Sequence, residues 1–149
     1  MSYTEEISGK INELLEKNYD AQKGFLNSSE NVKNTNLKTY FKTKALEREK
    51  FSDELKREII SFGEKPTDSG SITGNVHRAW MDIKSVVASN DEEAILEEVQ
   101  RGEEASLEDY NEVLNQTSLP QSTRAMLTRQ RNAVQNSVNN AKRYEQIVS

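Results

Sequence analysis

The sequence contains no cysteine and a single histidine, His77, among its 149 residues. The absence of cysteine excludes thiol catalysis, disulfide bonds and thiolate metal sites. One histidine leaves little for acid–base catalysis, which uses that side chain more often than any other. The chain also lacks a glycine-rich phosphate loop, the His-Glu-x-x-His motif of zinc proteases and the nucleophile elbow of hydrolases. The sequence therefore indicates no familiar type of catalytic site.

Long apolar runs and dense basic runs are missing as well. No apolar run approaches the roughly 20 residues needed to span a bilayer, and residues 1–6 have neither the basic nor the apolar region of a secretion signal. The net charge is −5 and the pI is near 5.1, whereas affinity for nucleic acid comes mainly from clustered Lys and Arg. We expect a soluble cytoplasmic protein that binds neither membranes nor nucleic acid.

What the sequence does contain is helical periodicity. Its 34% apolar and 30% charged residues are typical of narrow buried stripes on solvated helices. Apolar residues recur at helical spacing in four long segments, and a shorter amphipathic segment lies between the second and the third. The expected helices cover about 4–27, 35–62, 91–115 and 120–147, and the short one covers about 72–88.

Several of the helix ends carry recognisable signals. Ser2 and Asn90 are each followed three residues later by a glutamate, so both are predicted N-terminal caps. Residues 27–31, Asn-Ser-Ser-Glu-Asn, predict a turn-rich break after the first helix. Gly63 is a natural stop for the second helix.

The lengths of the connections predict how the helices are arranged. The first and third connections are short, so each joins an antiparallel pair, whereas the middle connection of about 27 residues can travel the length of a bundle. We therefore expect one all-α domain over residues 1–149. Its expected fold is a ferritin-like, up-down-down-up four-helix bundle, with a short extra helix in the long crossover between the second and third long helices.

Three polar side chains interrupt the apolar stripes of this bundle. Asn18, Arg48 and Glu103 lie on the buried faces of three different helices, and aligning the helix midpoints places them in one layer near Val134. A carboxylate that faces a core needs hydrogen-bond partners or a metal ion, because burying an uncompensated charge is very costly. Arg48 could supply charge-assisted hydrogen bonds to Glu103.

A carboxylate-bridged di-metal site is the competing hypothesis for this layer. Such a site takes a Glu from each of two helices and a Glu-x-x-His from each of the other two. The chain offers Glu103 and Glu47, but the segment 120–147 contains no histidine, and Arg48 places a cation at the centre. We expect a buried polar cluster of Asn18, Arg48 and Glu103 without a cofactor, and keep metal binding by Glu103 and Glu47 as the alternative.

A second constellation involves the crossover. Asp20 and Gly24 lie on the back of the first helix, away from the bundle seam, so another element should pack there. Either the crossover or a partner subunit could do so. An Asp20–Arg78 ion pair would lock the crossover, with Trp80 as its packing anchor and His77 on its flank. The competing interpretation is a ligand pocket built from Asp20, His77 and Trp80.

Five stretches of the sequence are distinctive. They are Asp20-x-x-x-Gly24-Phe25, Leu37 through Leu55 with Glu47 and Phe51, residues 77–84 (His-Arg-Ala-Trp-Met-Asp-Ile-Lys), Ala94-Ile95-Leu96, and Gly102-Glu103-Glu104 with Tyr110. Through them the chain resembles, over nearly its whole length, a bacterial family of small four-helix-bundle proteins with a ferritin-like fold and no assigned function. The resemblance implies a fold and no activity. Where that family has a His-Asp pair on the last helix, this chain has Val138 and Asn139.

These observations favour a non-enzymatic bundle that acts as an interaction module. A stress-related role is suggested only by analogy with other ferritin-like folds, which is a weak argument for function. Four amphipathic helices permit self-association without requiring it. A homodimer and an unidentified protein partner are both consistent with the sequence.

Overall fold

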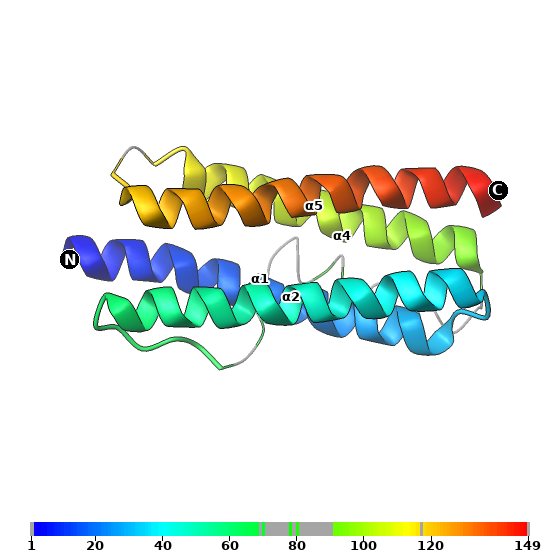
Figure 1. The fold of residues 1–149 in the computed structure, drawn as a ribbon, viewed down its shortest axis with the longest axis horizontal. Helices are drawn as coiled ribbons and strands as arrows, with labels where there is room; N and C mark the ends of the chain where they lie inside the picture. The colour runs from blue at the N-terminus through cyan, green and yellow to red at the C-terminus, as the bar shows by residue number, and fades with distance from the viewer. Residues whose placement is uncertain are drawn as a thin grey trace.

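The computed structural model describes residues 2–68, 70, 78, 80, 91–116 and 118–148, with side chains up to residue 144. It contains four long helices, and the all-α four-helix prediction is confirmed (Figure 1). They are α1 (Tyr3–Asn31), α2 (Thr35–Ser61), α4 (Glu92–Leu114) and α5 (Gln121–Val148). None of these described helices is both long and apolar enough to cross a membrane.

The four helices lie side by side as two antiparallel pairs, α1 with α2 and α4 with α5 (Figure 1). At one end of the bundle the Tyr3 hydroxyl donates a hydrogen bond to the Ser118 carbonyl, and at the other the Asn34 amide donates to the Glu92 carboxylate over 3.0 Å. Helix α4 therefore starts at the end opposite to the one where α2 stops. The helix directions are up, down, down and up; the likeness to ferritin-like proteins stays a prediction.

The first helix is longer than the sequence indicates, and the turn-rich break predicted at 27–31 is wrong. These residues continue α1, and the break comes at 32–34 instead. The reason lies in their side chains: the Ser28 hydroxyl donates to the Gly24 carbonyl over 2.9 Å, and the Asn31 amide donates to the Asn27 carbonyl over 2.7 Å. Ser and Asn here bond to the preceding helical turn rather than to a reverse turn.

The other helix ends follow local capping chemistry. The Ser2 hydroxyl accepts the Glu5 amide over 3.2 Å, as the capping pattern predicts. The cap of α4 is Asp91 rather than the predicted Asn90, because the Asp91 carboxylate accepts the Ala94 amide over 3.2 Å. Gly63 has φ 79°, the left-handed conformation that favours glycine at the end of a helix.

The apolar core consists of two clusters, one toward each end of the bundle. One contains Ala21, Phe25 and Ala45 together with Trp80, and the other contains Leu14, Leu15, Leu55 and Tyr110 among its members. Arg48 lies on α2 between Ala45 of the first cluster and Leu55 of the second. The helix predicted over 72–88 lies outside the described residues except for Arg78 and Trp80, which are both helical.

Candidate functional site

Arg48 lies in the middle of the bundle with only 1% of its surface exposed. Its Nη1 donates to Oδ1 of Asn18 on α1 over 3.0 Å, and its Nη2 donates to Oε1 of Glu103 on α4. Both partners are buried as well. The structure thus brings together, from three different helices, the three polar residues that the sequence places in one layer.

The hydrogen bonds continue from this layer to the surface. Asn18 donates to the hydroxyl of Tyr110 over 2.9 Å, and that hydroxyl donates to Oε1 of Gln130 on α5 over 2.7 Å. We call Glu103, Arg48, Asn18, Tyr110 and Gln130 the buried hydrogen-bond chain. It joins all four helices, so each polar group in it fixes the position of the next.

At its outer end the buried hydrogen-bond chain reaches a surface ion pair. Gln130 Nε2 donates to Oε1 of Glu54 over 3.3 Å, and Glu54 pairs with Arg129. The hydrogen bond from Arg129 lowers the pKa of Glu54. Sequence reasoning missed Tyr110 and Gln130 as members of the network. Gln130 carried a usable signal, because it is a polar residue on an apolar stripe, as Asn18 is.

Burial dominates the electrostatics of the layer. It raises the pKa of Glu103 above its ordinary value, whereas the Arg48 guanidinium and the Ser137 hydroxyl oppose that rise. Burial likewise raises the pKa of Tyr110 to about 12, so its hydroxyl keeps its proton at neutral pH and can donate to Gln130. The layer is therefore arranged to hold hydrogen bonds with defined donors and acceptors.

The raised pKa of Glu103 predicts a pH dependence of stability. A carboxyl group whose folded pKa exceeds its unfolded value binds its proton more tightly in the folded state. Its contribution to the free energy of unfolding is therefore fully present below the ordinary value of 4.5 and is lost as pH rises through the folded pKa. As pH rises from 4.5 through the folded pKa of Glu103, the wild-type protein should lose stability relative to the Glu103→Gln variant.

Urea unfolding of both proteins from about pH 4 to about pH 8 measures this difference, because other titrating groups are common to the two. The free energy of wild type minus that of Glu103→Gln should fall with pH. A difference that rises with pH would show that Arg48, rather than burial, controls the pKa.

Glu47, the second acid of the metal hypothesis, has a different partner. Its carboxylate lies 3.4 Å from the ammonium of Lys44, one turn earlier on α2, and its side chain is partly exposed. Within the described part of the chain, no group of three or more His, Asp or Glu side chains could hold a metal ion. At the position of the predicted layer, Glu103 instead has a buried guanidinium as its neighbour.

Trp80 of the crossover is held between two glycines. A Cβ atom added to Gly24 on α1 would lie 2.1 Å from Cε3 of the indole, and one added to Gly102 on α4 would lie 2.6 Å from Cε2. Trp80 is 0% exposed, and its ring centroid lies 4.9 Å from that of Phe25. Only a residue without a side chain lets the indole approach both helices so closely.

The other residues of the predicted crossover lock are only partly described. Asp20 is buried, and a Cβ at Gly70 would lie 2.3 Å from its Oδ1, so the connection passes directly over this carboxylate. Arg78 is exposed. His77 lies outside the described residues. The Asp20–Arg78 ion pair and the pocket of Asp20, His77 and Trp80 both stay predictions.

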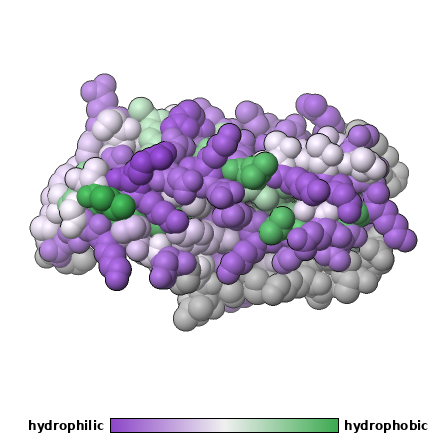
Figure 2. All heavy atoms as spheres, turned by 60° about the horizontal axis from the view of Figure 1, so that its bottom comes forward, coloured by the Kyte–Doolittle hydropathy of each residue, from purple (hydrophilic) through white to green (hydrophobic). Residues whose placement is uncertain are grey.

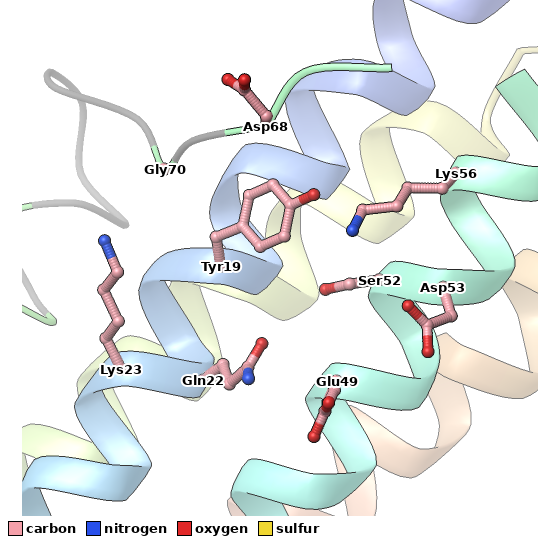
Figure 3. Close-up of a pocket in the computed structure, with 9 residues that line it drawn as sticks. All are labelled: Tyr19, Gln22, Lys23, Glu49, Ser52, Asp53, Lys56, Asp68 and Gly70. Carbon is pink, nitrogen blue, oxygen red and sulfur yellow. The ribbon is translucent and has the colours of Figure 1, made fainter.

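A polar cleft of about 300 Å³ lies between α1, α2 and the start of the crossover (Figure 3). Tyr19 and Lys56 point toward each other across it, and the Tyr19 hydroxyl donates to the Thr67 carbonyl over 3.2 Å. Its lining carries charges of both signs. The lining residues are Tyr19, Gln22, Lys23, Glu49, Ser52, Asp53, Lys56, Asp68 and Gly70.

Comparison with known proteins identifies one family. The model of a family described as "Domain of unknown function (DUF2383)" matches residues 6–116. The match includes Asn18, Arg48 and Glu103 and ends before α5. It confirms the resemblance to an uncharacterised helical family, while the bacterial origin stays a prediction. A comparison with curated proteins found no match.

Proposed function

Because the chain belongs to the DUF2383 family, whose function is not assigned, we propose a function from the arrangement of its own residues. The protein is a non-enzymatic helical bundle that acts in the cytoplasm as an interaction module. In this proposal the interior maintains the shape of the bundle, and the solvated helix faces bind other proteins. A stress-related role would be one setting for such a module and rests on analogy of fold alone.

The observation that supports this proposal is the buried guanidinium of Arg48. It donates to Glu103 on one side and to Asn18 on the other, so it compensates the carboxylate that a metal site would use. A fixed positive charge next to that carboxylate also repels a divalent cation. In this proposal the role of the buried hydrogen-bond chain is to fix the positions of the four helices relative to one another.

Metal analysis separates this proposal from carboxylate-based metal binding. Protein purified without chelators should contain well under one equivalent of iron, manganese or zinc per chain when it is measured by plasma mass spectrometry. Added Fe²⁺ or Mn²⁺ should leave the melting temperature unchanged, because a metal that binds only the folded state would raise it.

Stoichiometric metal in wild-type protein would overturn the proposal. The Glu103→Gln and Glu47→Gln variants would then serve as matched tests of the alternative. Loss of the metal from both would assign it to the two carboxylates.

A further inference from the structure

The outer face formed by α1 and α2 carries exposed apolar side chains among hydrophilic ones (Figure 2). Leu46 on α2 is 60% exposed and Leu26 on α1 is 45% exposed. Both line a groove of about 290 Å³ between the two helices, and the exposed lining of this groove is mainly apolar. We call this the α1–α2 groove; its lining residues are Gln22, Leu26, Lys42, Ala45, Leu46 and Glu49.

The same face is covered by the chain itself at its other end. There the Asn12 side chain donates to the Lys65 carbonyl over 3.1 Å and accepts the Thr67 amide over 2.8 Å. This holds the connection after α2 against α1. Leu26 and Leu46 lie beyond that contact and remain exposed to solvent. Large apolar side chains that line a groove and stay exposed often mark an interaction surface.

Two opposite charges on α2, Lys42 and Glu49, lie at equal distances from the centre of this groove. The reference point is the midpoint between Ala45 and Leu46. Lys42 lies as many residues before this midpoint as Glu49 lies after it. A helix turns about 100° per residue, so Lys42 and Glu49 lie on the same side of α2, next to Leu46. Neither forms an ion pair within the described part of the chain.

A second pair of charges repeats this relation further from the centre. Lys38 and Asp53 are equally distant from the same midpoint and lie on the same side of α2. They too have no ion-pair partner among the described residues. The two lysines therefore precede the apolar centre along α2 and the two acidic residues follow it, where Lys23 and Lys56 lie beside Glu49 and Asp53.

We propose that a second copy of this chain covers the α1–α2 groove. The two α2 helices run antiparallel about a two-fold axis through the midpoint of Ala45 and Leu46. Lys42 of each copy then meets Glu49 of the other, while Leu46 of each enters the groove of the other. A two-fold interface uses one surface twice and so must be self-complementary.

The self-complementary spacing of Lys42 and Glu49 favours a second copy of this chain, rather than a different protein, as the occupant of the α1–α2 groove. A different partner would require charges that complement its own surface, without any relation between Lys42 and Glu49. The dimer also goes beyond the proposed function. Leu46 is on the surface and Glu103 is in the core, so the dimer would stand even if the core bound a metal.

Sedimentation equilibrium over a range of concentrations tests the dimer. Wild-type protein should approach twice the 17.0 kDa mass of one chain. Glu49→Lys should raise the dissociation constant by about ten-fold or more, because two attractive charge pairs become repulsive. The double variant Lys42→Glu/Glu49→Lys restores both pairs in exchanged positions and should recover the wild-type dissociation constant.

The matched control is Glu97→Lys, which reverses the charge of an exposed residue on α4 and should leave the dimer intact. Leu46→Glu should give a folded monomer, because Leu46 is exposed in the single chain. A wild-type monomer at all concentrations would overturn the proposal and leave another protein as the occupant. Failure of the exchanged double variant to restore the dimer would also overturn it.

Discussion

Replacing Arg48 by leucine should lower the free energy of unfolding by about 3–5 kcal/mol at neutral pH. The variant leaves the Glu103 carboxylate in the core without its counter-ion and takes away the donor to Asn18. Loss of one member of a buried pair is costly because the remaining carboxyl group must either stay charged without a counter-ion or take up a proton. Urea unfolding followed by circular dichroism gives the value.

Substitution of the other partner, Glu103, by glutamine should be tolerated better than Arg48→Leu. Glu103→Gln keeps an oxygen that can accept from Arg48, and it resembles the protonated carboxyl that burial already favours. The double variant Arg48→Leu/Glu103→Leu removes both charges and should be more stable than Arg48→Leu, because apolar replacement of a whole buried pair is often neutral or stabilising. An unchanged melting temperature for Arg48→Leu would rule out the buried ion pair.

Truncation of Trp80 should have an effect of similar size. Trp80→Ala removes the largest fully buried side chain, and such substitutions cost about 3–5 kcal/mol because a cavity remains. Gly24→Ala should cost about 1–3 kcal/mol in the wild type, since its Cβ would lie 2.1 Å from a rigid ring. Thermal and urea unfolding of the single variants measure both losses.

The sign of the Gly24→Ala effect should reverse when Trp80 is absent. In the Trp80→Ala background the added methyl group meets no indole, and alanine is favoured over glycine within a helix by up to about 1 kcal/mol. Gly9 is the matched control on α1, because a Cβ there has nothing within 4 Å. Gly9→Ala should stabilise both backgrounds. A Gly24→Ala effect that is equal in the two backgrounds would contradict the close packing of Trp80.

The polar layer could be located from sequence because its members are polar residues on apolar stripes. Asn18, Arg48 and Glu103 interrupt the periodicity of three helices at matching depths, and each helix length fixes the depth. Tyr110 gave no such signal. Its ring is suited to an apolar stripe, and only the position of its hydroxyl, which depends on the neighbouring helices, makes it part of the network.

Other features were hidden for equally physical reasons. Ser28 and Asn31 have the composition of a turn, yet bonds to the previous helical turn keep them in α1. Gly24 indicated that something approaches the back of α1. Periodicity gives the direction of a side chain about its own helix axis and does not tell which element lies opposite. Nothing in the residue spacing showed that Gly102 also packs against the indole ring of Trp80.

The position of Trp80 also bears on how the bundle is assembled. Gly24 and Gly102 belong to different helical hairpins, so the narrow space for the indole exists only once the two hairpins have come together. Each hairpin can form through local contacts, whereas this space depends on contacts between distant parts of the chain. We therefore expect the fluorescence of the only tryptophan to follow the joining of the two hairpins rather than the formation of the helices.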